Sequence, residues 1–280
     1  MSDLLQQHLS ELPAFRALLR AVEARFYAER LPMPRPVLDL GCGDGHFASL
    51  AFGDVEAGFD PWWGPLMEAR ERGVYRTLTL ADGAQMPYPD EYFATVVSNS
   101  VLEHIANVES VIVEAGRVLR PGGWLYFSVP GPNFLPFLSI GRALDRAGMR
   151  PLGDAYRRFF NRISRHHHCD GRDVWERRLA MAGLELARSW AYFSRRALTA
   201  LEWGHYLGLP SLLCKVIAGR WILWPSQANL WLTDRLVRPF YEERLSQPPA
   251  ARSQPMPSAS SEGAYLFFVA QKPRGPEAPD

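Results

Sequence analysis

A cluster of glycine and aspartate residues near position 40 has the spacing of a ligand-binding turn. Asp39 lies in a short apolar run, residues 37–40, and glycines follow at positions 41, 43 and 45. Glycine has no Cβ, so alternate glycines let the backbone turn sharply and approach a bound molecule closely. Residues 47–52 read as the following helix, whose free N–H groups point at the same ligand. A strand, a glycine turn and a helix predict the first unit of a doubly wound α/β sheet.

A second aspartate is placed to bind a sugar. Asp60 ends an expected strand at 55–59 and lies 19 residues beyond Gly41. At this separation in nucleotide-binding sheets, an acid at the end of the second strand reaches a pair of ribose hydroxyls. Trp62 and Trp63 follow, and they have two interpretations: stacking on an adenine ring or capping the hydrophobic core.

Three later segments add motifs in a set order. They are Ala81-Asp82-Gly83-Ala84-Gln85-Met86-Pro87-Tyr88-Pro89-Asp90, Ser100-Val101-Leu102-Glu103-His104-Ile105 and Leu119-Arg120-Pro121-Gly122-Gly123. In the glycine turn, His46 stands where the dinucleotide fingerprint G-x-G-x-x-G needs a glycine, and the order is D-x-G-x-G-x-G. Together these motifs resemble those of the class I S-adenosylmethionine-dependent methyltransferases, in the ubiquinone/menaquinone-biosynthesis-like (type 11) branch.

The resemblance implies a Rossmann-like, doubly wound seven-stranded α/β sheet, with six parallel strands and an antiparallel last strand between the fifth and the sixth. It implies S-adenosyl-L-methionine as the cofactor. The glycines would face its methionine part, Asp60 its ribose and Asp82 with Gly83 its adenine. The expected cofactor-binding residues are Asp39, Gly41, Cys42, Gly43, Asp60, Pro61, Asp82, Gly83, Ala84, Ser98, Asn99 and Ser100, the last three at the methyl end.

His104 is the expected catalytic residue, because histidine titrates near neutral pH and this one follows the fourth expected strand. His104 is either a general base or a structural residue that orients its loop. Glu103 beside it likewise has either a catalytic role or an electrostatic role at the start of a helix. His166, His167 and His168 precede a resumed helix, where related enzymes have a loop at the acceptor pocket. Contiguous residues cannot all point at one ion, and no second Cys/His group has matching spacing, so we expect no metal site.

Hydrophobic periodicity and turn residues predict the secondary structure. Strands are expected at 37–40, 55–59, 75–80, 95–98, 124–129, 184–193 and 264–270. Two helices are expected before the first strand, and others at 65–72, 108–119, 137–148 and 173–182. Gly122 and Gly123 are expected to cap the helix at 108–119.

The charges are distributed unevenly along the chain. Residues 37–129 hold five Lys/Arg against thirteen Asp/Glu, whereas residues 131–172 hold eight Arg against three Asp. The basic part suggests an anionic substrate or surface, or only a solvated arginine face. We expect N-terminal helices over the site (1–36), a cofactor-binding core (37–130), a basic insertion (131–172), the rest of the sheet (173–193 and 264–272), a helical Trp-rich insertion (194–245) and a flexible linker (246–263).

The second insertion carries an apolar stripe at helical spacing, followed by tryptophans. The stripe is Leu209, Leu212, Leu213, Val216 and Ile217, and the tryptophans are Trp221, Trp224 and Trp231. It could pack on the sheet domain, form a lid over an apolar acceptor pocket, or make a peripheral membrane contact through residues 205–240. With the basic insertion, it favours a small-molecule acceptor that is lipophilic or anionic.

Composition and cysteine usage limit the class of protein. An apolar content of 47% and a charged content of 22% are ordinary for a soluble globular protein. Three widely spaced cysteines favour a reducing compartment, and no secretory signal or membrane-spanning run is visible, so we expect a cytoplasmic protein that is soluble or lies on a membrane. No nucleic acid partner is expected. The function predicted is methyl transfer, with a non-catalytic cofactor-binding scaffold and a nicotinamide oxidoreductase as alternatives.

Overall fold

The computed structural model describes residues 3–207, 217, 230–249 and 262–274. The chain forms two compact units. The first comprises residues 1–29, 132–165 and 191–264, and the second comprises residues 30–131, 166–190 and 265–280. Among the described residues, none of the helices combines the length and apolar character needed to span a lipid bilayer.

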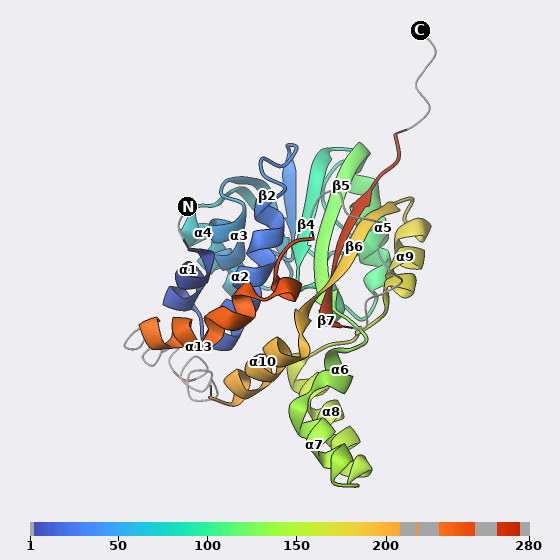
Figure 1. Ribbon diagram of the computed structural model, residues 1–280. Coiled ribbons are helices and arrows are strands. Elements are labelled where there is room, and N and C mark those ends of the chain that lie inside the picture. The colour runs from blue at the N-terminus through green and yellow to red at the C-terminus, as the bar shows by residue number, and fades with distance from the viewer. Residues whose placement is uncertain (1–2, 208–216, 218–229, 250–261, 275–280) are drawn as a thin grey trace. The chain divides into compact units, whose positions relative to one another are not determined.

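A seven-stranded sheet with strand order β3-β2-β1-β4-β5-β7-β6 organises the fold (Figure 1). The ladders from β3 through β5 are parallel, and β7 runs antiparallel to β5, with Trp124 opposite Gln271. This confirms the predicted seven-stranded fold with its inserted last strand. The strands are β1 (Val37–Leu40), β2 (Val55–Asp60), β3 (Tyr75–Leu80), β4 (Phe93–Asn99), β5 (Leu119–Pro130), β6 (Glu185–Ser194) and β7 (Gly263–Gln271).

The helices agree with the periodicity in the cofactor core and depart from it in the insertions. They are α1 (Leu4–Glu11), α2 (Ala14–Ala28), α3 (His46–Ala51), α4 (Trp63–Arg72), α5 (Val108–Val118), α6 (Phe134–Phe137), α7 (Ser139–Arg146), α8 (Arg150–Ser164), α9 (Arg172–Met181), α10 (Arg195–Leu207) and α13 (Leu230–Glu242), with 3-10 turns η1 (Leu102–His104) and η2 (Arg244–Ser246).

The predicted glycine cap of α5 is wrong. Leu119 ends the helix in an extended conformation and pairs with Phe93, so the strand begins directly after the helix. Phe93 and Thr95 pair with Leu119 and Trp124, and residues 120–123 form an irregularity in this ladder, where Gly122 has φ +78°. The side chain of Leu119 is fully buried, and this burial holds the chain in the sheet instead of letting it turn through a capping glycine.

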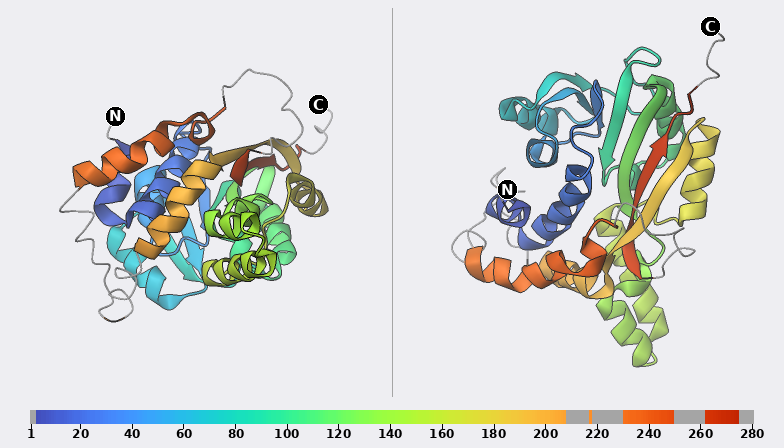
Figure 2. Two further views of the ribbon diagram at one scale, coloured as in Figure 1. Left: turned by 60° about the horizontal axis from the view of Figure 1, so that its bottom comes forward. Right: turned by 45° about the horizontal axis from the view of Figure 1, so that its top comes forward.

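The single helix predicted at 137–148 is also wrong. Leu138 is extended between α6 and α7, and the fully buried carboxylate of Glu202 on α10 accepts the backbone N–H groups of Ser139, at 2.6 Å, and Ile140. A side-chain carboxylate at this position satisfies free N–H groups and favours the positive end of the helix dipole, so α7 begins at Ser139. α8 was not predicted, and it packs beside α7 (Figure 2).

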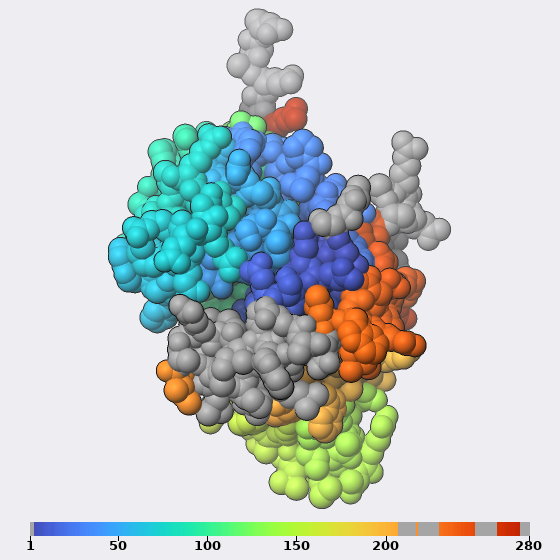
Figure 3. Space-filling model, turned by 90° about the vertical axis from the view of Figure 1, so that its left-hand side faces the viewer, coloured from blue at the N-terminus to red at the C-terminus, as the bar shows by residue number. Residues whose placement is uncertain are grey.

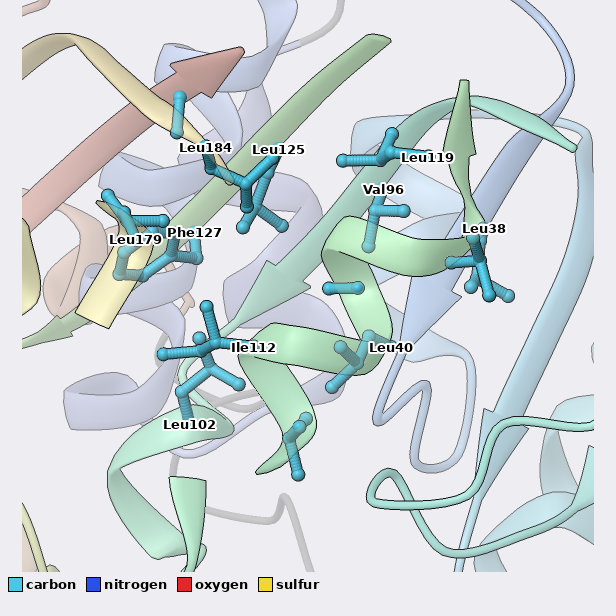
Figure 4. Packing of buried hydrophobic residues seen from close by; sticks show 14 of the residues in the cluster. Leu38, Leu40, Val96, Leu102, Ile112, Leu119, Leu125, Phe127, Leu179 and Leu184 are labelled. Carbon is cyan, nitrogen blue, oxygen red and sulfur yellow. The ribbon is translucent and has the colours of Figure 1, made fainter. Parts of the chain in front are cut away.

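The core of the second unit lies where α5, α9 and η1 meet the sheet (Figure 4). Leu38 of β1, Val96 of β4 and Ile112 of α5 are at most 1% exposed. Phe127 of β5 stacks on Phe268 of β7, with ring centroids 4.7 Å apart. Each such buried side chain stabilises the fold by roughly 1.5–3 kcal/mol, so the packed core holds the strand ends in fixed positions.

In the first unit, α1 and α13 lie side by side (dark blue and orange in Figure 3). Arg238 on α13 pairs with Asp3 at the start of α1, and Arg25 on α2 donates to the carbonyl oxygens of Tyr241 and Ser246. These contacts tie the N-terminal helices to the end of the second insertion. Most of the predicted apolar stripe, together with Trp221 and Trp224, lies outside the described residues. The last residue of the stripe, Ile217, and the third tryptophan, Trp231, are exposed.

Candidate active site

The glycine turn after β1 has the geometry that the sequence pattern predicts. Gly41 and Gly43 have φ of +74° and +54°, which favour glycine. A Cβ on Gly41 would lie 2.4 Å from Cγ1 of Val101, whereas a Cβ on Gly43 would meet nothing within 4 Å. Gly41 is therefore required by packing against the segment after β4, and Gly43 leaves open space beside the turn.

Asp60 closes the turn from the neighbouring strand. Its Oδ2 accepts the N–H of Gly43 at 3.0 Å, and its Oδ1 accepts the N–H of Trp62 at 2.9 Å. The residue is 7% exposed. Burial raises the pKa of its carboxyl, and the two backbone hydrogen bonds oppose this rise. Each oxygen keeps a second acceptor position, so the carboxylate is oriented by the backbone and can still accept hydroxyl protons.

Asp39 is buried beside a residue that the sequence analysis missed. The hydroxyl of Tyr75, at the start of β3, donates to Oδ2 of Asp39 at 2.6 Å. A Cβ on Gly58 would lie 2.8 Å from the Tyr75 ring, so a glycine at this position of β2 lets the ring reach β1. Burial, assisted by the charge of Asp60, raises the pKa of Asp39 to about 7, against the lowering effect of the Tyr75 hydrogen bond.

Cys42 lies in the glycine turn and is 8% exposed. Burial is the main cause that raises the pKa of its thiol far above the usual range, and the nearby carboxyl of Asp39 adds to the effect. A thiol is a nucleophile only as the thiolate. Cys42 therefore contributes its backbone to the turn, through an N–H that donates to the carbonyl of Phe59 at 3.0 Å.

The loop after β3 presents Asp82 to solvent and buries Gly83. Oδ1 of Asp82 accepts the N–H of Ala84 at 2.9 Å, and the residue is exposed. A Cβ on Gly83 would lie 3.1 Å from the side chain of Val111 on α5. Arg117, which the sequence analysis missed, fixes the far end of this loop by donating to the carbonyl oxygens of Met86 and Tyr88.

Pro61, Trp62 and Trp63 lie on the surface. Trp62 is 70% exposed and Trp63 is 65% exposed. The interpretation of this pair as a cap on the hydrophobic core is therefore wrong. Stacking on an adenine ring stays a prediction.

The end of β4 is bound into the sheet by hydroxyl hydrogen bonds. Oγ of Ser98 donates to the carbonyl of Leu40 at 3.2 Å, and Oγ of Ser128 donates to Oδ1 of Asn99 at 2.9 Å. The N–H of Ser100 donates to Ser128, and Ser100 has φ +52°. A serine in this conformation costs free energy unless its surroundings hold it, and such positions cluster at functional sites.

The predicted histidines fall into different environments. His104 is 41% exposed and its ring lies 5.4 Å from that of His166. Burial, and then the proximity of His104, lowers the pKa of His166 to about 3, so this imidazole is neutral. His167 is exposed, and Nε2 of His168 lies 3.0 Å from the carbonyl oxygen of Ile105.

The candidate residues thus gather at the carboxyl ends of four parallel strands, β1 to β4, where open α/β sheets bind ligands. A glycine turn beside two buried carboxyls, on a sheet with this strand order, is the arrangement of the class I S-adenosylmethionine-dependent methyltransferase fold. Residues 38–127 match the family model described as a methyltransferase domain. Over these residues the chain is therefore similar to this class of enzymes, and the similarity implies S-adenosyl-L-methionine as the methyl donor.

Curated relatives agree on this class. The chain is 37% identical over 113 residues to a probable S-adenosylmethionine-dependent methyltransferase of Mycolicibacterium smegmatis, covering 39% of this chain and 42% of that one. It is 34% identical over 149 residues to a ubiquinone biosynthesis O-methyltransferase of Chromobacterium violaceum, covering 47% and 63%. The chain spans about half the length of the curated relatives it matches.

Solved structures share the fold over most of the chain. Geranyl diphosphate C-methyltransferase from Streptomyces coelicolor aligns with a TM-score of 0.52 at 13% identity, over 90% of this chain and 77% of that one. The cyclase SpnF aligns with a TM-score of 0.52 at 19% identity, over 91% and 82%. At these identities the likeness concerns the fold alone.

Proposed function

We propose that this enzyme transfers a methyl group from S-adenosyl-L-methionine to a small-molecule acceptor by in-line displacement. The observation that carries the proposal is the order of three acids along adjacent strands. Asp39 lies on β1, Asp60 ends β2 and Asp82 follows β3. A ligand lying across the ends of these strands meets the acids in the order methionine, ribose and adenine.

The residues fit this cofactor in two respects. The open space at Gly43 lets the backbone approach a bound molecule closely. The carboxylate of Asp60 is held by two backbone N–H groups, so it is oriented before any ligand arrives. Asp82 would accept a hydrogen bond from the adenine amino group, and the backbone N–H of Gly83 would donate to a ring nitrogen.

The cofactor, when bound, supplies an electrophilic methyl group on a sulfonium. The chain then has to align the acceptor, exclude water and accept a proton where the acceptor carries one. His104 is the candidate base, because it lies three residues after Val101, which packs against Gly41, and is partly exposed. Aligning the acceptor with the methyl group lowers the activation barrier by several kcal/mol even without a base, and the reduction reaches roughly 7–11 kcal/mol in the best cases.

A surface of the basic insertion supports a lipophilic acceptor taken from an anionic lipid surface. Leu152, Phe159 and Ile163 lie on one face of α8 and are 55%, 50% and 36% exposed. Arg158 and Arg162 flank this face and are exposed as well. Apolar side chains beside arginines on one helix face suit the interface of an anionic bilayer.

Isothermal titration with S-adenosyl-L-methionine and with NAD tests the cofactor. Asp60→Ala should weaken binding of the methyl donor by roughly 1.5–3 kcal/mol, about 10-fold to 150-fold, the range for lost hydrogen bonds to a charged group. Asp54→Ala, a matched control at an exposed aspartate just before β2, should bind as the wild type does. Unchanged affinity of Asp60→Ala would remove the ribose assignment.

Turnover separates an enzyme from a scaffold. Methyl-labelled donor incubated with a panel of lipophilic and anionic acceptors should give a labelled product at a rate that depends on the enzyme concentration. Tight donor binding without turnover on any acceptor class would favour the non-catalytic scaffold.

A further inference from the structure

Three potential metal ligands meet at the end of β4. Glu103, His104 and His166 each offer one ligand atom, and these atoms all lie within 4.8 Å of one another. Nε2 of His104 lies 3.8 Å from Oε1 of Glu103. Glu103 is 1% exposed, whereas His104 is 41% exposed in its side chain, so the group is buried on one side and open on the other.

Backbone hydrogen bonds hold the two contributing segments together. The carbonyl of Glu103 accepts the N–H groups of His167, at 2.8 Å, and His168, at 3.3 Å. Nε2 of His168 donates to the carbonyl of Ile105 at 3.0 Å, because its Nδ1 accepts from Arg178 at 3.2 Å. His166 is thus tied to the turn that carries Glu103, and the three side chains are brought together before any ion binds.

Arg178 fixes the outer end of this arrangement. It is 9% exposed and pairs with Asp170 at 2.6 Å and with Glu109 at 2.8 Å. Its guanidinium also lies over the ring of Trp175, 4.7 Å from the centroid. Supporting contacts of this kind are what orient the ligands of metal sites and tune their affinity.

We propose that Glu103, His104 and His166 bind one divalent transition-metal ion, Zn²⁺ or Mn²⁺. Two imidazoles and a carboxylate are a donor set that such ions accept. Metal–ligand bonds of about 2.0–2.2 Å place neighbouring ligand atoms of a tetrahedral site roughly 3.4 Å apart. The observed 3.8 Å between His104 and Glu103, and the limit of 4.8 Å for the group, require only small side-chain rotations.

Three protein ligands leave coordination positions open, as in catalytic rather than structural sites. Val101, two residues before Glu103, packs against the glycine turn at Gly41, so the ion would lie beside the methyl end of the cofactor. This role rests on the proposed function. The ion would bind an acceptor with two neighbouring oxygen atoms, one of them a hydroxyl.

The ion would lower the pKa of that hydroxyl, whose proton leaves to solvent. The oxygen then attacks the methyl carbon; an O–C bond forms, the S–C bond breaks, and its electron pair returns to sulfur. With the ion bound, His104 would be a ligand, and the lowered pKa of the acceptor hydroxyl would take the place of the general base considered for His104 under the proposed function. The expectation of no metal site considered the three contiguous histidines together, whereas the structure joins one of them to a turn 62 residues earlier.

The test is metal binding by tag-free protein after chelator treatment and dialysis. Zn²⁺ and Mn²⁺ are titrated separately by calorimetry, and bound metal is counted by mass spectrometry. The wild type should bind one equivalent of at least one of these ions. His166→Ala and Glu103→Gln should each weaken binding by about tenfold or more, whereas His167→Ala should keep it.

Titration of the same variants with S-adenosyl-L-methionine is the control for folding and for the proposed function. His166→Ala should bind the donor with wild-type affinity while losing the ion. No stoichiometric ion on the wild type, or equal losses in His166→Ala and His167→Ala, would overturn the metal site. An ion bound by a wild type that does not bind the donor would refute the proposed function and leave the metal site standing.

Discussion

The buried carboxyl of Asp39 should make stability fall as the pH rises. Its pKa is raised from an ordinary 3.8 to about 7, chiefly by burial. A carboxyl with a higher pKa in the folded state is protonated more readily there than in the unfolded chain. The folded state is therefore more stable when the Asp39 carboxyl is neutral than when it is ionised. The contribution of Asp39 to the free energy of unfolding is therefore highest below pH 4, decreases between about pH 4 and pH 7, and is constant above that range.

The size of the effect follows from the two pKa values. A rise from 3.8 to about 7 corresponds to roughly 4 kcal/mol of stability lost once the carboxyl is fully ionised. This is a large part of the total stability of a typical domain, about 5–15 kcal/mol. Asp39→Asn removes the ionisation and keeps an oxygen that accepts the Tyr75 hydroxyl. The variant should be more stable than the wild type at pH 8 and close to it at pH 4.

Urea unfolding of both proteins at intervals from pH 4 to pH 8 measures this difference directly. Taking variant minus wild type cancels the titration of all groups that the two share. The difference should grow by several kcal/mol across the interval and level off near pH 8. Parallel curves at all pH values would refute the argument that burial raises the pKa of Asp39.

The same carboxyl should release a proton when the cationic methyl donor binds. A positive charge beside Asp39 favours its ionised form. Calorimetric titration in buffers of different ionisation enthalpy should show release of nearly one proton at pH 6 and almost none at pH 8.5. Asp39→Asn should show no such release at either pH.

Two further predictions address the glycine turn and the basic insertion. Gly41→Ala places a Cβ 2.4 Å from Val101 and should abolish donor binding or unfold the turn, whereas Gly53→Ala, with a similar φ of +71° and nothing within 4 Å, should cost only about 1–2 kcal/mol in thermal or urea unfolding. If Gly41→Ala and Gly53→Ala lose the same amount of stability, the effect comes from the backbone conformation alone and not from the contact with Val101. In a flotation assay with anionic vesicles, the wild type should rise with the vesicles and the Leu152→Ser/Phe159→Ser double variant should stay in the unbound fraction. If neither protein floats with the vesicles, the lipid surface is removed from the proposal.

The cofactor half of the fold is predictable because local and global signals agree there. Residues 37–40 and 75–80 are short apolar or β-branched runs between turn residues, and both are strands with the predicted bounds. The motif order supplies the strand order by resemblance. The position of Asp60 at a strand end follows from the same pattern, since it stands where an apolar run stops, and Asp39 lies one residue before the end of its run.

What the sequence does not reveal are contacts between residues far apart in the chain. Tyr75 reaches Asp39 only because Gly58 on the intervening strand has no side chain, and three separate segments must be aligned to see this. The cap of α7 by Glu202 is hidden in the same way, because the carboxylate comes from a helix about 60 residues later. Periodicity reports which face of a helix is apolar, and it carries no information on a distant cap.

The three contiguous histidines show how a local motif can be divided by its surroundings. His168 accepts a hydrogen bond from Arg178 and donates to Ile105, which fixes its ring away from its neighbours. With His168 fixed in this way, His167 is exposed and the ring of His166 lies 5.4 Å from that of His104. Arg178→Met should therefore loosen His166 as well as His168. Weaker binding of Zn²⁺ or Mn²⁺ by this variant, with donor affinity retained, would be the consequence of a residue that touches neither the ion nor the donor.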